Sequence, residues 1–212
     1  MDRDHLLAAL RHDGITDNRV LSAIAAVPRD EFVAPQHQPA AWENHPLPIG
    51  CGQTISQPLI VAYMTELLDL RPGDHVLDVG TGCGYQAAVL AQLGCQVLGV
   101  ELVPELAARA RATLTRLGYC VDVATGDGYE GRPDDAPFDG ILVAAAAAEA
   151  PAALLDQLRL PERGKRGGRL VIPIENWDGA PGQRLVLIER TPDDWRRQVL
   201  DRVRFVPLVR GG

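Results

Sequence analysis

The stretch Val76-Leu77-Asp78-Val79-Gly80-Thr81-Gly82-Cys83-Gly84-Tyr85 decides the expected fold. Its first half is an apolar run that ends in glycine, which predicts a buried strand over 75–80, and a helix is expected over 86–93. Three glycines at alternate positions between a strand and a helix permit a sharp turn and leave bare backbone for a ligand. A dinucleotide-binding fingerprint needs its third glycine one residue later, where Tyr85 stands. The spacing therefore disfavours NAD and leaves another adenosine ligand open.

The alternation of strand and helix continues towards the C-terminus. The pattern predicts further strands and helices in this order: strand 96–101, helix 104–117, strand 121–124, strand 138–144, helix 151–159 and strand 169–174. Apolar strands separated by helices indicate parallel strands that are covered on both faces. Segments 184–189 and 203–209 are expected to form an antiparallel pair at one edge. The expected fold class is α/β, a doubly wound and mostly parallel Rossmann-like sheet with an antiparallel C-terminal edge.

The N-terminal quarter is expected to form a helical cap and a substrate loop. Two short helices are predicted, the first ending near Gly14 and the second capped by Thr16 and stopped by Pro28. The prolines and glycines of 33–52 exclude regular structure there. Ser56 is expected to cap the next helix. One domain over 1–212 is predicted, with 1–56 as cap and substrate loop and 57–212 as core.

Composition limits the classes of function. The chain has 212 residues, 46% of them apolar, and a net charge of −7, which argues against a nucleic-acid binder. No apolar stretch is long enough to span a membrane, and no secretory signal is visible. Segment 159–212 is basic, with 12 basic and 7 acidic side chains, and either is a solvated surface or meets an anionic peptide. The four cysteines predict free thiols of a cytoplasmic protein, without a disulfide or a metal site: Cys51, Cys83, Cys95 and Cys120.

Two further loops are expected to join the glycine turn at the carboxyl edge of the sheet, where open α/β sheets bind ligands. Glu101 ends the next strand and can accept hydrogen bonds from both ribose hydroxyls of an adenosine, or else cap the following helix. Gly126-Asp127-Gly128 follows the third strand and either sets Asp127 beside an adenine or is an ordinary turn. The combination is the pattern of an S-adenosylmethionine-dependent methyltransferase.

The stretch Pro48-Ile49-Gly50-Cys51-Gly52-Gln53-Thr54-Ile55-Ser56-Gln57-Pro58 makes the resemblance specific. Together with the glycine motif and other matching segments it resembles the protein-L-isoaspartate (D-aspartate) O-methyltransferases almost from end to end. Those other segments are 27–33, 63–67, 126–129, 136–139, 167–173 and 203–208. The resemblance implies S-adenosyl-L-methionine as cofactor, S-adenosyl-L-homocysteine as product, and isoaspartyl-containing proteins or peptides as partners. We also expect a monomer that binds neither nucleic acid nor membrane.

The resemblance assigns roles position by position. Ser56 matches the catalytic serine. The implied cofactor-binding residues are Gln53, Thr54, Ile55, Asp78, Gly80, Thr81, Gly82, Cys83, Gly84, Glu101, Asp127 and Gly128. The implied substrate-binding residues are Ile49, Ser56, Val206, Pro207 and Leu208. The chain departs from the family pattern at Asn44, Cys51 and Ala148, and it carries extra residues at 161–166 and 176–182.

The expected reaction needs no general base. A carboxylate with a pKa near ~4 is ionised at neutral pH and is itself the nucleophile. Catalysis is then mainly alignment, an effect worth up to about 7–11 kcal/mol. We expect repair of L-isoaspartyl residues through a methyl ester that collapses to a succinimide. Two alternatives remain open at this point: an aspartyl O-methyltransferase that installs an aspartimide in a natural-product peptide, and a non-catalytic adenosine-binding protein.

Overall fold

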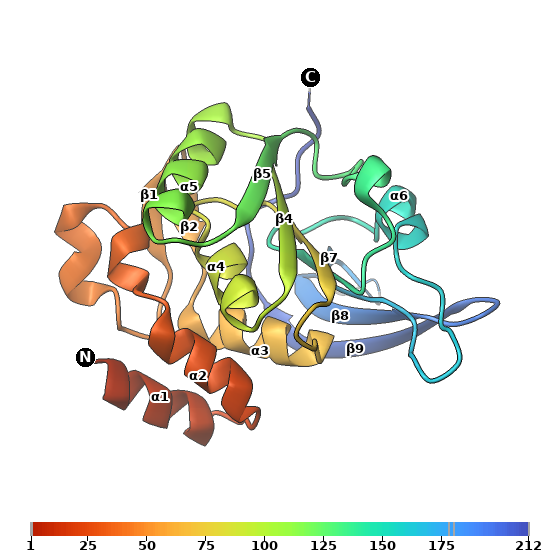
Figure 1. Cartoon of the computed structure of the whole chain (residues 1–212), viewed down its shortest axis with the longest axis horizontal. Helices are drawn as coiled ribbons and strands as arrows, with labels where there is room; N and C mark the ends of the chain where they lie inside the picture. Colours follow the sequence, from red (N-terminus) through yellow and green to blue (C-terminus); the bar gives the residue numbers. More distant parts are fainter. Residues whose placement is uncertain (1, 178, 180, 212) are drawn as a thin grey trace.

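A central sheet organises the computed structural model, which describes residues 2–177, 179 and 181–211 (Figure 1). In this part of the chain the strand order is β5-β4-β3-β6-β7-β8-β9. The strands are β3 (His75–Val79), β4 (Gln96–Glu101), β5 (Val121–Thr125), β6 (Gly140–Val143), β7 (Arg169–Glu175), β8 (Gln183–Arg190) and β9 (Trp195–Val203). Pairs from β5 to β7 are parallel, and β8 and β9 pair antiparallel. The predicted fold class is therefore confirmed.

Helices cover both faces of this sheet. One face carries α3 (Pro58–Leu68), α4 (Tyr85–Gln92) and α5 (Pro104–Arg116), and the short α6 (Ala152–Asp156) lies on the other. Strand alternation explains the division, because Val76 packs with the α3 and α4 cluster while Leu77 packs with the α6 cluster. Both faces of the central strands are thus buried, as their apolar runs predict.

The N-terminal helices α1 (Arg3–His12) and α2 (Asn18–Ala26) pack beside α3 and α4 (Figure 1). The prediction that Thr16 caps the second helix was wrong. Asp17 is the N-cap, and its side chain accepts a hydrogen bond from the Arg19 amide. The amides of Thr16 and Asp17 both donate to Oε1 of Glu66 on α3, which fixes α2 to that helix.

The prediction that 33–52 lacks regular structure was also wrong. The 3₁₀ helices η1 (Arg29–Phe32) and η2 (Pro35–Ala40) precede an antiparallel hairpin of β1 (Leu47–Gly50) and β2 (Gln53–Ile55). Proline is compatible with these places, because Pro35 begins a helix and Pro48 lies exposed in an edge strand. Short elements can therefore accommodate these prolines at their starts or within them.

Ser56 does not cap α3, contrary to the prediction. The helix begins at Pro58 with Gln57 in the N-cap position and no hydrogen bond from that side chain. The acceptor comes from outside the helix, because Oδ1 of Asn44 accepts from the Leu59 amide at 3.0 Å. The Ser56 side chain is thus left out of the capping interaction.

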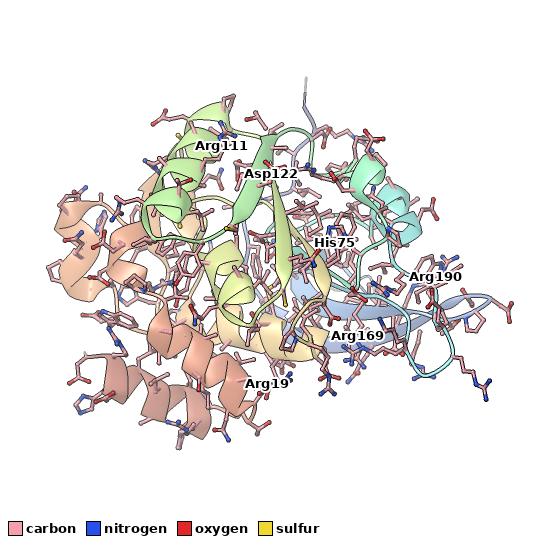
Figure 2. The ribbon with its side chains drawn as sticks, in the orientation of Figure 1. Arg19, His75, Arg111, Asp122, Arg169 and Arg190 are labelled. Carbon is pink, nitrogen blue, oxygen red and sulfur yellow. The ribbon has the colours of Figure 1, made fainter. Side chains whose placement is uncertain are left out.

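Three arginines bind the other end of α3. Arg19 and Arg169 point towards it from α2 and β7, and Arg166 reaches it from the extra segment 161–166 (Figure 2). Arg166 and Arg169 donate to carbonyls of the last helical turn, which lack intrahelical partners, and Arg19 donates to a carbonyl just beyond the helix. The acceptors are the carbonyl oxygens of Leu67, Leu68 and Leu70. In the extra segment 176–182, residues 178 and 180 lie outside the described residues.

The predicted strand at 203–209 was misplaced. The edge strand is β9, and its exposed, arginine-rich sequence hides it from a search for apolar runs. The apolar run continues beyond the sheet as a tail over 204–211. Its Pro207 bridges Ala146, whose amide donates to Val206 and whose carbonyl accepts from Leu208. Contact with this loop leaves Val206 and Leu208 half-buried, so an apolar run there does not require a sheet strand.

Replacing Asn44 tests the capping interaction of α3. Asn44→Ala should lower the free energy of unfolding by about 1 kcal/mol, because the Leu59 amide loses its acceptor. Asn44→Asp keeps an acceptor and adds a charge that the helix N-terminus favours, so it should be at least as stable as the wild type. Urea unfolding checks both variants. Equal stability of Asn44→Ala and wild type would contradict the capping role.

Candidate active site

A cavity opens at the carboxyl edge of the parallel strands. Its lining contains predicted site residues from well-separated parts of the sequence. They are Ile49, 53–56, 80–83, Glu101, Gly128 and 206–208. The hairpin, the ends of β3 and β4, the turn after β5 and the C-terminal tail therefore meet at one place. Three predicted cofactor residues, Asp78, Gly84 and Asp127, do not line the cavity.

The glycine turn after β3 serves two purposes. Gly82 has a φ of +58°, and a Cβ there would lie 3.2 Å from Cδ1 of Ile49, so bare backbone faces the cavity. Gly84 has a φ of +93° and begins α4, where a Cβ would lie 3.0 Å from Cδ1 of Leu114 on α5. Gly82 thus shapes the cavity, whereas Gly84 permits close packing of two helices.

Glu101 joins the ends of two neighbouring strands. Its carboxylate is 7% exposed and accepts hydrogen bonds from the amides of Gly82 at 2.8 Å and Val103 at 2.9 Å. Val103 is the residue before α5, so the side chain also orders the start of that helix. Each carboxylate oxygen retains capacity for another donor. Glu101 is consequently held in place and can still accept hydrogen bonds from a ligand.

Asp78 is a buried carboxyl without a partner. It is fully enclosed, and neither oxygen has a hydrogen-bond partner among the described residues. Burial, with a smaller contribution from the charge of Glu101, raises the pKa of Asp78 to about 7. An ionised carboxylate in such surroundings requires a compensating cation. Burial therefore favours the protonated, neutral form of the Asp78 side chain.

Asp127 fastens the tail. Its Oδ1 accepts from the Tyr129 amide at 2.8 Å, and its Oδ2 accepts from the Gly211 amide at 3.0 Å. The next residue, Gly128, lies against both the sheet and the tail, because a Cβ there would be 2.8 Å from Val79 and 3.2 Å from Leu208. The turn thus closes one side of the cavity by close backbone approach.

The β1–β2 hairpin carries the opposite wall. Cys51 and Gly52 form its two-residue turn with φ values of +51° and +71°, as the twist of a tight hairpin requires. The following residues 53–55 form β2, and the chain then reaches the half-buried Ser56 before α3 begins. The hairpin thereby brings Ser56 to the cavity beside the glycine turn.

Some lining residues were missed by the sequence analysis. Ile60, Val61 and Met64 on α3, with Tyr85 and Gln86 on α4, complete the wall beneath the hairpin. The apolar spacing of α3 predicts only a buried helix face, which does not distinguish a core from a cavity wall. Tyr85 and Gln86 directly follow the glycine motif, and that position is the signal that could have found them.

Comparison with known proteins identifies the family of this chain. The family profile described as protein-L-isoaspartate(D-aspartate) O-methyltransferase (PCMT) matches residues 1–212. The chain belongs to this family. The protein-L-isoaspartate O-methyltransferase of Gloeobacter violaceus is 50% identical over 202 residues, covering 95% of each chain. The family resemblance predicted from the motifs is therefore confirmed.

Solved structures of this family share the fold. A structure titled protein-L-isoaspartate O-methyltransferase has a TM-score of 0.85 and 29% identity, covering all of this chain, which spans 66% of the solved chain. A structure from Plasmodium falciparum, described as a complex with S-adenosyl-L-homocysteine, has a TM-score of 0.83 and 26% identity over the whole of both chains. Among the described residues, no helix has the length and apolarity that crossing a membrane requires.

Asp78 should make the stability depend on pH in a defined direction. Its folded pKa of about 7 lies above the ordinary 3.8, so the folded protein keeps a proton that the unfolded chain releases. The contribution of Asp78 to the free energy of unfolding falls by about 1.4 kcal/mol per pH unit between about pH 4 and 7 and is then constant. Asp78→Asn lacks this loss. Its free energy of unfolding, relative to that of the wild type, should therefore be about 2–3 kcal/mol higher at pH 8 than at pH 5. Urea unfolding at both pH values measures this, and a pH-independent difference would refute it.

Proposed function

We propose that the chain methylates L-isoaspartyl residues of damaged proteins and peptides, with S-adenosyl-L-methionine as the methyl donor. The observation that carries the proposal is the convergence of the hairpin, the glycine turn, Glu101 and the tail on one cavity. The relatives described above carry the isoaspartate name, and nothing in them supports the alternative of a natural-product aspartimide enzyme. We further propose that the enzyme acts as a monomer in the cytoplasm, which its free cysteines suit.

The residues present fit this cofactor. When bound, S-adenosyl-L-methionine supplies a methyl group on a positively charged sulfur. The bare backbone of 80–83 would lie against the ligand, and Glu101 would accept from the ribose hydroxyls with its remaining lone pairs. Asp78 is buried beneath the glycine turn and would support that turn without touching the ligand. Gly128 would border the adenosine side.

Ser56 would hold the substrate carboxylate. Its hydroxyl is free of the helix cap and lies at the cavity, two residues before α3 begins. The N-terminus of α3 has amide groups and a positive dipole end that favour an anion nearby. Ile49 and the tail residues 206–208 would enclose the neighbouring part of the peptide. The chain thus provides binding, orientation and exclusion of water.

No proton transfer by the protein is required at this step. The isoaspartyl α-carboxyl has an ordinary pKa near ~4 and enters as the anion. The work of these residues is to align its oxygen with the methyl group, an effect worth up to about 7–11 kcal/mol. The ester then leaves the enzyme and closes to a succinimide, because the backbone amide nitrogen displaces methanol. Hydrolysis of that ring returns part of the chain to aspartate.

A labelled-methyl assay with paired peptides tests the substrate. A peptide with one L-isoaspartyl residue should be labelled, and the same sequence with aspartyl at that position should be labelled far less. The reason is that the isoaspartyl link presents a free α-carboxyl attached directly to Cα, whereas the aspartyl residue presents a β-carboxyl one methylene further from the main chain. A matched aspartyl peptide serves as control. Equal labelling of the two peptides, or labelling of the aspartyl peptide alone, would refute the proposed substrate.

Replacing Ser56 tests its assigned role. Ser56→Ala should lower kcat/KM for the isoaspartyl peptide by about 10- to 100-fold, because a hydrogen bond to a charged group contributes about 1.5–3 kcal/mol. The affinity for S-adenosyl-L-homocysteine, measured by calorimetry, should stay within about twofold and shows that the variant is folded. Undiminished kcat/KM in Ser56→Ala would exclude the residue from the reaction.

A further inference from the structure

Strand β1 contains an irregularity at the cavity wall. Leu47 pairs with Ile55, Pro48 with Thr54, and Gly50 with Gln53, so the register shifts between Pro48 and Gly50. Ile49 is the extra residue and has no partner on β2. A bulge of this kind takes a residue out of the ladder and changes the direction of its side chain. Here the side chain is 5% exposed and lines the cavity next to Gly82.

Arg109 on α5 binds the backbone at this bulge. Its Nη2 donates to the carbonyl oxygen of Ile49. The guanidinium lies over Gly50, since Nη1 and Nη2 are 3.6 and 3.8 Å from the point where a Cβ would stand. Gly50 has a φ of +88°, so glycine suits both the conformation and the close approach. The Arg109 side chain therefore donates to the carbonyl of Ile49, the residue that has no pairing partner on β2.

The same face of α5 makes a second contact with the hairpin. Cys51 in the turn lies with its Sγ 3.6 Å from Oε2 of Glu105, which is one helical turn before Arg109. The two contacts hold the outer edge of the hairpin against α5. Neither Arg109 nor Glu105 lines the cavity. Their influence on a ligand therefore has to act through the hairpin.

We propose that Arg109 is a positioning residue for methyl transfer, because it holds the bulged β1 strand so that the hairpin stays closed on the glycine turn. The proposal rests on the function proposed above. The hairpin leads directly through 53–55 to Ser56, so its angle sets where Ser56 and Ile49 lie. Without Arg109 the hairpin spends less time in the competent position. Apparent affinity for the peptide falls by that fraction, while the rate from the bound state is largely retained.

The test compares Arg109→Ala with a matched control on the same helix. Arg111, labelled in Figure 2, also donates to a backbone carbonyl, that of Val123 at 2.7 Å, but on the side of β5. Arg109→Ala should raise KM for the isoaspartyl peptide about tenfold with kcat changed less than threefold. Arg111→Ala should leave both constants within about twofold. Arg109→Lys, which keeps one charged donor, should recover most of the lost affinity.

Hydrogen–deuterium exchange gives a readout that does not depend on activity. Backbone amides of 47–55 should exchange faster in Arg109→Ala than in wild type, and those of β4 should not. Arg111→Ala should not change exchange in the hairpin. Equal KM and equal hairpin exchange in Arg109→Ala and Arg111→Ala would overturn the role of Arg109. Failure of the wild type to methylate the isoaspartyl peptide would instead overturn the proposed function, and hairpin exchange would still decide for or against the positioning role.

Discussion

The carboxylate of Glu101 is the interaction on which the site depends. It accepts the Gly82 amide from the turn after β3 and the Val103 amide before α5, so one side chain fixes the two loops that form the cavity floor. Burial beneath the same turn and, to a smaller extent, the charge of Glu101 raise the pKa of Asp78 to about 7. The Glu101 carboxylate, held by two amides, is thus a preorganised acceptor at this floor, where the ribose hydroxyls of the proposed donor would bind.

The walls of the cavity are fixed by contacts outside it. The tail is fastened through Ala146 on one side and Asp127 on the other. Helix α3, which follows Ser56, is capped by Asn44 at its start and by arginines at its end. A reaction that relies on alignment alone needs such support, because small displacements of a positioned group are costly in rate. The arrangement places packed elements behind each wall, and the polar Ser56 and Glu101 line the cavity in front of them.

Local patterns predicted the central part of the fold and the floor of the site. Strand β4 was predicted at 96–101, which are its bounds in the structure, because a short apolar run between two loops predicts a buried strand. The positive φ values of Gly80 and Gly82 agree with a glycine turn that leaves backbone bare. Glu101 could be placed at the edge because the carboxyl ends of parallel strands lie together.

Long-range contacts account for what the sequence analysis missed. Asn44 caps a helix that begins 14 residues later, and no local pattern marks that pairing. The run 203–209 is apolar because it packs on Ala146, so it resembles a strand without being one. The carbonyl of Ile49 at the bulge accepts from Arg109, which lies on a different element and meets it only in the folded chain.

A crystal structure with S-adenosyl-L-homocysteine and an isoaspartyl peptide tests the central claim most directly. Glu101 should keep its contacts with Gly82 and Val103 while both ribose hydroxyls donate to its oxygens, and the ligand's sulfur should face a carboxylate held by Ser56. A nucleoside bound away from Glu101, or a peptide carboxylate on the far side of the hairpin from Ser56, would contradict the assignment.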